Sequence, residues 1–263
     1  MHATKGNGKL AKRIGVFDIL VLPPLVCRGA KKCLAFCFAI KLQNTLLSVL
    51  LRRLENLEAT LQPDFADKMV LWILQSGVEV MSPHHAGDFW GQYYVHVWER
   101  IARRVPHRQF ACYTKSLDLD LTPLTSLSNW ILIKSYGGKF DNRIDQTKDN
   151  YARVIHSASQ ARLDEWICPD KGSKGNKKAY GIAKVCGATC NYCLEPGYQK
   201  RLCFIEKRQG WNGRRLLLAT KKMLEHPDLL MRLRATSRRI IALNAQFPPP
   251  PRGRASRSGS VAP

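Results

Sequence analysis

Acidic residues and long apolar runs are both scarce in this chain of 263 residues. Asp and Glu number 20 against 42 Lys and Arg, which gives a formal net charge of +22. No segment approaches the roughly 18 to 20 apolar residues that cross a bilayer. The apolar stretch 14–26 is interrupted by Asp18 and by Pro23-Pro24, and Val26 is not the small residue that a signal cleavage site requires. These absences argue against a membrane protein and predict a cytoplasmic one.

The positive charge is concentrated toward the C-terminus. Residues 199–263 contain fifteen Lys and Arg and three acidic residues. Such a surface favours anionic partners, DNA or RNA first among them. The plainer alternative is a solvated helix face followed by a disordered basic tail. From Phe247 onward the composition is Pro, Gly, Ser and Arg without an apolar period, which predicts disorder.

Segments with strand character alternate with amphipathic helical segments. We expect strands at 16–22, 78–80, 109–114, 130–135, 152–156 and 201–205, and helices over 43–62, 64–75 and 93–105, with a weaker one over 143–151. Strand starts about 22 to 30 residues apart fit successive βα units. The sequence therefore predicts an α/β fold with a parallel, barrel-like sheet.

Chemically reactive residues follow the expected strands. In a parallel barrel every loop after a strand opens on the same rim, so these residues are expected to meet at one mouth. In order of the strands they are Cys27, Cys33 and Cys37; His84, His85 and Asp88; Lys115; Ser135; and Cys168 after a possible further short strand.

The sequence has nine cysteines, and those that are clustered are interpreted as metal ligands because a reducing compartment disfavours disulfides. The spacing Cys186-x3-Cys190-x2-Cys193, with an aromatic residue before the last Cys, is that by which radical S-adenosylmethionine enzymes hold a [4Fe–4S] cluster. The group Cys27-x5-Cys33-x3-Cys37 is looser in spacing but similar in kind. Zinc is the alternative, as a closed site of four thiolates from Cys168, Cys186, Cys190 and Cys193. Cys112 and Cys203 are expected to be packing residues.

The loop after the second strand is open to several interpretations. His84 and His85 point in different directions, so at most one is expected to face the mouth. Asp88 either caps the helix that starts near Trp90 or binds a cationic group of a ligand. A third interpretation is a metal-dependent nuclease using these residues, although one carboxylate is little for a two-metal site.

An ordered run of short motifs over about residues 6–206 resembles the phage and plasmid gene product 88 family. The motifs are Gly6-Asn7-Gly8-Lys9-Leu10, Leu22-Pro23, Cys27-Arg28-Gly29-Ala30, Cys33, Cys37-Phe38-Ala39, Gly87-Asp88-Phe89, Tyr113-Thr114-Lys115-Ser116, Ser135, Cys168-Pro169 and the group of Cys186, Cys190 and Cys193. The sequence departs from that family at Arg28 and Phe38, where proline and tyrosine are commoner.

The family in turn looks like a relative of radical S-adenosylmethionine proteins. The resemblance implies a partial (β/α)₆ TIM-like barrel with cysteine-rich insertions over 1–206. Beyond it, the composition predicts a basic helical extension over 207–246 and a disordered tail over 247–263. The resemblance also implies an iron–sulfur cluster, and S-adenosylmethionine bound near Gly87, Asp88, Phe89, Lys115 and Ser135. Position favours Cys27, Cys33 and Cys37 as the ligands of the cofactor-binding cluster, while spacing favours the later three cysteines. The competing hypothesis is a zinc-stabilised nucleic-acid-binding protein without catalysis.

Overall fold

The computed structural model describes residues 1–6, 10–168, 192–205 and 225–249. These residues form a mixed α/β structure built on one sheet of eight strands. The strands are β1 (Thr4–Lys5), β2 (Ile14–Phe17), β3 (Val80–Pro83), β4 (Gln109–Thr114), β5 (Trp130–Ser135), β6 (Tyr151–Ile155), β7 (Trp166–Ile167) and β8 (Arg201–Ile205).

The sheet is open and mostly parallel. Its strand order is β1-β2-β3-β4-β5-β6-β8-β7, and only the β1–β2 pair is antiparallel. From β2 to β6 each strand pairs with the next one along the chain, so the winding never reverses within these strands. The loops that leave these strands therefore all emerge at one edge of the sheet. This arrangement confirms the expected α/β class and the parallel sheet.

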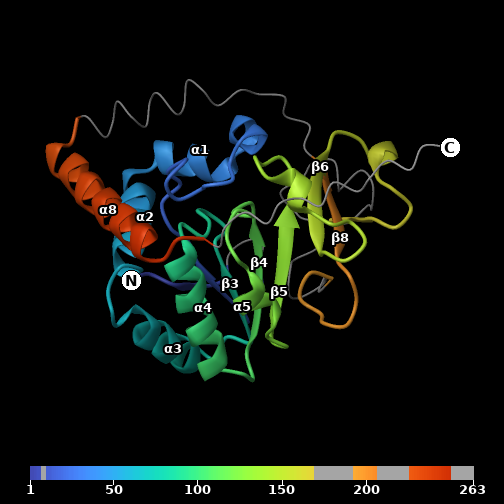
Figure 1. Cartoon of the computed structure of the whole chain (residues 1–263), viewed down its shortest axis with the longest axis horizontal. Coiled ribbons are helices and arrows are strands. Elements are labelled where there is room, and N and C mark those ends of the chain that lie inside the picture. The colour runs from blue at the N-terminus through green and yellow to red at the C-terminus, as the bar shows by residue number, and fades with distance from the viewer. Residues whose placement is uncertain (7–9, 169–191, 206–224, 250–263) are drawn as a thin grey trace.

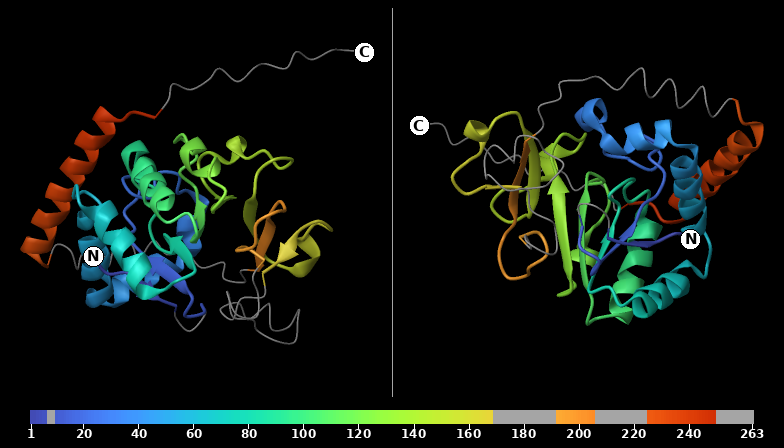
Figure 2. Two further views of the ribbon diagram at one scale, coloured as in Figure 1. Left: turned by 90° about the horizontal axis from the view of Figure 1, so that it is seen from below. Right: turned by 180° about the vertical axis from the view of Figure 1, so that it is seen from behind.

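Within the described residues, helices lie in most of the connections between strands, and one further helix follows the last strand along the chain. They are η1 (Lys32–Phe36), α1 (Phe38–Thr45), α2 (Leu47–Ala59), α3 (Phe65–Ser76), α4 (Gln92–Arg104), α5 (Thr122–Thr125), η2 (Asp141–Arg143), η3 (Ala158–Gln160) and α8 (Pro227–Gln246). Figure 1 shows α2 beside α8 at one end of the molecule and β6 with β8 at the other, and both views of Figure 2 agree. Among the described residues, no helix combines the length and apolar character of a membrane span.

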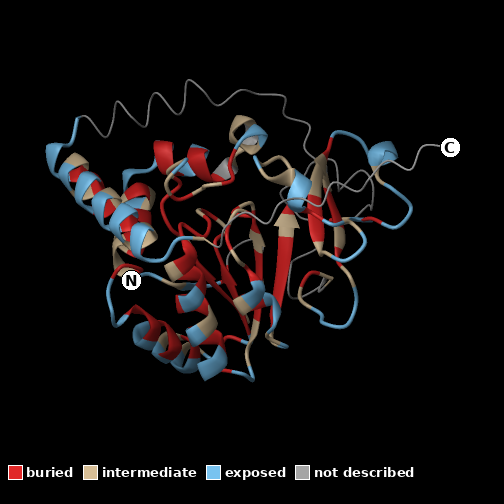
Figure 3. Cartoon of the chain, viewed as in Figure 1, coloured by how far each residue is buried: buried red, intermediate tan, exposed pale blue. Residues whose placement is uncertain are grey.

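Alternate strand residues build two separate cores. Phe110 and Leu132 face the helices and join the larger core, whereas Ala111 and Ile133 face the opposite side of the sheet. That opposite face is partly covered by Cys193 and its two chain neighbours. Figure 3 shows the central strands buried on both faces and the helices buried only along their inner stripe. Burial on both faces explains the nearly continuous apolar run of β5.

Helix α8 belongs to the larger core. Leu229, Leu233 and Ile240 are buried in it. The Asn244 side chain donates to the Trp90 carbonyl at 3.1 Å, and Arg232 pairs with Glu58 of α2 at 2.6 Å. The C-terminal helix therefore packs against α2 and the start of α4.

Several expected boundaries are wrong. The strand expected at 16–22 is β2, Ile14–Phe17, and the chain leaves the sheet after Phe17 because the next backbone groups bond elsewhere. Ile19 N–H donates to Ala86 O, and Leu20 N–H donates to Arg53 O. The helix expected over 43–62 is two helices, separated at Leu46, whose backbone is extended. The weak helix expected over 143–151 is absent from the described structure, which has the three-residue η2 and turns there.

Candidate functional site

Four loops converge at the edge where the parallel strands end. The loop after β2, with Cys27, Cys33 and Cys37, lies against the loops after β4 and β5. Cys33 N–H donates to Gly137 O at 3.1 Å, and Lys139 N–H donates to Gly29 O at 2.8 Å. The approach at Gly29 is so close that a Cβ there would lie 1.7 Å from Lys115 O. Only glycine lets these loops meet, and the expected convergence after the first four parallel strands is confirmed.

The three thiols of this loop influence one another electrostatically. Burial raises the pKa of the Cys27 thiol well above its usual value, and the negative charges of Asp88, Cys37 and Cys33 add to the effect. Burial also raises the pKa of Cys33, where the Lys115 ammonium acts in the opposite direction. Segments far apart in the sequence thus place three thiols, a carboxyl group and an ammonium group in one electrostatic environment.

Asp88 is a buried carboxyl group fixed to the end of β4. Its Oδ1 accepts from the Thr114 hydroxyl at 2.6 Å and from its neighbour Phe89 N–H at 2.8 Å, and its Oδ2 accepts from Lys115 N–H at 2.8 Å. Burial raises the pKa of Asp88, and these hydrogen bonds oppose that rise. Asp88 does not cap α4, which begins at Gln92 after Gly91 without a side-chain cap. The capping interpretation is wrong because the carboxylate is turned toward β4.

The other expected cofactor-binding residues divide between the edge and the core. Gly87 has φ +86, and a Cβ there would lie 2.3 Å from the Ile19 side chain, so this loop requires glycine. The Lys115 backbone and the buried Ser135 lie at the ends of β4 and β5. The Phe89 ring, however, packs edge-on against His84 with 4.9 Å between ring centroids. Phe89 therefore contributes its backbone to the edge and its side chain to the core.

Arg53 is a residue at this edge that sequence reasoning missed. It lies on α2, is 5% exposed, and donates to the Ala39 carbonyl at 2.8 Å, two residues after Cys37. Its second partner is Asp18 at 3.5 Å. Burial lowers the pKa of Arg53, while the charges of Asp18, Cys37 and Cys27 oppose that shift. A single arginine that faces inward from an amphipathic helix does not change the spacing of its apolar residues, so the sequence pattern does not reveal it.

The two histidines have local partners instead of facing the thiols together. His84 is buried and its Nε2 lies 3.0 Å from the Tyr94 hydroxyl. Burial lowers its pKa to about 3, so the imidazole is neutral. His85 lies 3.0 Å from the Ser82 hydroxyl. A shared site of both histidines with Asp88 is not formed, because His84 points into the aromatic core around Tyr94 and Trp98.

The later cysteines lie elsewhere. Cys193 accepts a hydrogen bond from the Tyr113 hydroxyl at 3.1 Å on the sheet face opposite the helices. Cys168 is buried beside β8, where its N–H donates to Cys203 O at 2.8 Å. Cys186 and Cys190 lie outside the described residues. Cys112 is buried in the larger core and Cys203 in a smaller cluster with Ile155, as expected of packing residues.

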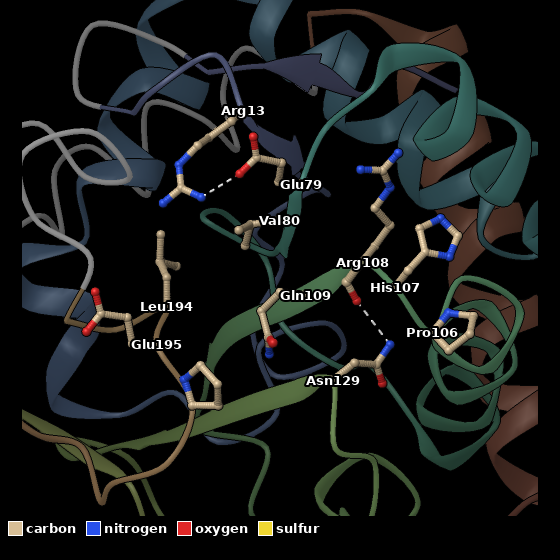
Figure 4. A pocket seen from close by; sticks show the side chains of 11 residues that line it. Arg13, Glu79, Val80, Pro106, His107, Arg108, Gln109, Asn129, Leu194 and Glu195 are labelled. Atoms are coloured by element: carbon tan, nitrogen blue, oxygen red, sulfur yellow. Dashed lines mark hydrogen bonds and ion pairs between the residues drawn. The ribbon is translucent and has the colours of Figure 1, made fainter.

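The described residues contain no group of three or more His, Cys, Asp or Glu side chains arranged around a single metal ion. Neither of two hollows in the described surface is lined by Cys27, Cys33 or Cys37. One of about 290 Å³ is at the opposite edge of the sheet, where Arg13 pairs with Glu79 at 2.7 Å. Figure 4 shows this pair facing Leu194 and Glu195 across the hollow. Another, of about 400 Å³, lies beside the Lys134–Asp149 ion pair.

Comparison with known proteins identifies one family. The family model described as "Gene product 88" matches residues 1–228. No curated protein matches the chain, and no solved structure matches it. The match covers every parallel strand and ends at the second residue of α8.

Proposed function

The chain belongs to the gene product 88 family, and we propose that it is an iron–sulfur protein whose cluster is held by Cys27, Cys33 and Cys37. The observation that carries this proposal is the convergence at the edge of the sheet. There, three thiols of one loop lie in the electrostatic range of one another and of Asp88. Active sites of parallel α/β proteins form at this edge.

The donor set fits a cluster of several irons. Such a cluster binds each thiolate through a different iron, so the thiols need not share one ion. Thiolates are the ligands that iron–sulfur chemistry requires, and nearby cations stabilise them. Lys115 acts on Cys33 and Arg53 acts on Cys27 and Cys37 in this way. The residues therefore supply both the ligands and part of the compensating charge.

We extend the proposal to S-adenosylmethionine as the bound cofactor, in keeping with the family's resemblance to radical enzymes. A cluster with one iron free of protein ligands supplies a binding place for the amino acid moiety of that cofactor and a source of electrons. Asp88 holds a carboxylate at the edge, beside the Gly87 backbone, and can receive an ammonium group. Lys115 and Ser135 complete the polar rim, and the partial (β/α)₆ barrel is the fold that this function would use.

The later cysteines are proposed to hold a second metal. Cys168 and Cys193 are buried against the sheet, and Cys186 and Cys190 would supply the other thiolates. Zinc and iron–sulfur both accept such a set. Metal analysis of a Cys193→Ala variant separates this centre from the first, because the variant should lose only the second metal.

The deciding experiment is anaerobic purification and reconstitution of the full chain, followed by iron, sulfide and zinc analysis. A brown protein with a reducible cluster in electron paramagnetic resonance is expected. The variants Cys27→Ser, Cys33→Ser and Cys37→Ser should each lose the iron of this centre, whereas the matched control Cys112→Ala keeps it. Colourless wild-type protein with stoichiometric zinc would contradict the proposal, and so would full iron in all three serine variants.

A second candidate function is nucleic-acid binding through the basic C-terminal part. Arg234 and Arg238 are exposed on α8, while Arg232 and Arg239 are used within the molecule. The logarithm of the binding constant falls linearly with the logarithm of the salt concentration, and each lost phosphate contact should reduce that slope by about one. We expect Arg234→Gln with Arg238→Gln to weaken DNA or RNA binding, and Lys148→Gln, at the other end of the molecule, to leave it unchanged. Equal binding by all three proteins would refute this role.

A further inference from the structure

The Arg53 guanidinium is buried and has its polar partners within the molecule. An arginine taken out of water requires paired charge and hydrogen bonds. Within the described residues Arg53 donates one hydrogen bond of 2.8 Å, to Ala39 O, and faces one carboxylate at 3.5 Å. That carboxylate belongs to Asp18, whose side chain is 28% exposed and also accepts from Ala86 N–H at 2.8 Å. The charges of Asp18, Cys37 and Cys27 all favour the Arg53 cation, which couples it to the thiol loop.

The contacts of Arg53 place it between two segments that border the thiols. Its carbonyl accepts from Leu20 N–H, in the segment that leads from β2 to the thiol loop. Its guanidinium donates a hydrogen bond to the carbonyl of Ala39, which lies in the first turn of α1, two residues after Cys37. Through Asp18 it is also joined to Ala86, which precedes the Gly87–Asp88 loop. Arg53 thus contacts the thiol loop directly and the Gly87–Asp88 loop through Asp18.

We infer that Arg53 is a positioning and charge-compensating residue of the thiol site: it fixes the chain beside Cys37 and opposes the negative charge of the thiolates at Cys27 and Cys37. This inference rests on the proposed cluster. Electrostatic coupling is reciprocal, so the thiolates that favour the Arg53 cation are favoured by it to the same degree. The cation also favours the reduced state of a bound cluster, because reduction adds negative charge.

The test is an anaerobic redox titration of the reconstituted full chain, followed by its visible spectrum. Arg53→Gln removes the charge and keeps a hydrogen-bond donor, so its reduction potential should become more negative than that of the wild type. A tenfold change in the ratio of reduced to oxidised cluster corresponds to about 59 mV for one electron. Arg53→Lys keeps the charge and should restore most of the wild-type potential. Arg52→Gln, an exposed neighbour on the same helix, is the matched control and should leave the potential unchanged.

Asp18→Asn supplies a readout of opposite sign. Loss of this carboxylate leaves Arg53 less compensated, so the potential should become more positive. If Arg53→Gln does not fold, as its circular dichroism would show, Arg53→Lys and Asp18→Asn decide the question. A wild-type chain without a cluster overturns the proposed function and this inference together. A cluster whose potential is the same in the wild type, Arg53→Gln and Asp18→Asn overturns only the role of Arg53.

Discussion

Replacing His84 with asparagine tests whether this histidine serves the core or a binding site. The residue has φ +65, a left-handed conformation that asparagine tolerates better than most residues. Its Nε2 lies 3.0 Å from the Tyr94 hydroxyl, and its Nδ1 has no hydrogen-bond partner within the described structure. Protonation of His84 would place a charge among Phe89, Tyr94 and Trp98, which explains why burial lowers its pKa to about 3.

The sign and the size of the effect follow from this pKa. The unfolded chain protonates His84 below its usual pKa of 6.5, whereas the folded chain keeps it neutral down to about pH 3. Stability is therefore lost as the pH falls from about 6.5 toward about 3. At about pH 5 the loss amounts to about 2 kcal/mol, since each unit of pKa difference is worth about 1.4 kcal/mol.

The assay is urea unfolding near pH 7.5 and near pH 5. His84→Asn should cost about 1 to 3 kcal/mol at the higher pH because the Tyr94 hydroxyl loses its partner. The variant should then lose about 2 kcal/mol less than the wild type on acidification. His85→Asn is the neighbouring control and should keep the acid sensitivity of the wild type. An identical pH dependence in the wild type and His84→Asn would refute the reasoning.

Three further predictions concern the sheet edge, a buried acid and the C-terminal helix. Asp88→Asn should destabilise the chain by about 2 kcal/mol or more in urea unfolding. An asparagine has one side-chain oxygen, so it cannot accept from both the Thr114 hydroxyl and the Lys115 N–H. Unchanged stability would contradict the geometry. Glu165 accepts from Arg153 at 2.6 Å, and its pKa is lowered to about 2 although burial opposes the shift. Glu165→Gln should therefore cost about 3 kcal/mol near neutral pH, and the loss should disappear as the pH falls from about 4.5 toward about 2; a pH-independent loss would refute the assignment. Leu233→Ala should lower the free energy of unfolding by about 2 to 5 kcal/mol. Ile241 is 60% exposed on the same helix, so Ile241→Ala should change it by about 0.5 kcal/mol or less in thermal unfolding. Equal effects would show that α8 is not packed as described.

The sequence predicts the strands best where a short apolar run is buried on both faces. The expected strands at 109–114, 130–135 and 201–205 coincide with β4, β5 and β8. The helix expected over 64–75 is α3, and Gly77 follows it with φ +67. In these segments the local pattern and the tertiary contacts favour the same structure, so the pattern is sufficient.

The same patterns fail where a residue is buried but its backbone does not pair within the sheet or helix. The apolar run 16–22 predicts one strand, and Ile19 and Leu20 are indeed fully buried. Their backbone N–H groups, however, donate to Ala86 and Arg53 outside the sheet. Leu42 and Leu46 continue the leucine period but are 43% and 49% exposed, because the helix is interrupted at Leu46. Periodicity reports which side chains can be buried and not which backbone groups pair.

The candidate site could be predicted in outline only. The order of strands places the early thiols, Asp88 and Lys115 at one edge, and this part required only the parallel topology. The direction of each side chain could not be derived in that way. The Asp88 side chain binds the end of β4 instead of capping α4. Nothing in the sequence distinguishes the buried Arg53 from its exposed neighbour Arg52. These directions depend on contacts between loops that are distant in sequence.

Helix α2 is held from both ends of the polypeptide. His2 N–H donates to the Asn56 side chain at 2.6 Å, and Arg232 pairs with Glu58 at 2.6 Å. The two partners lie 54 and 174 residues away from their positions on α2, so segments far apart in the sequence fix one helix. Loosening either segment therefore removes a contact from α2, the same helix whose Arg53 donates to the Ala39 carbonyl beside Cys37.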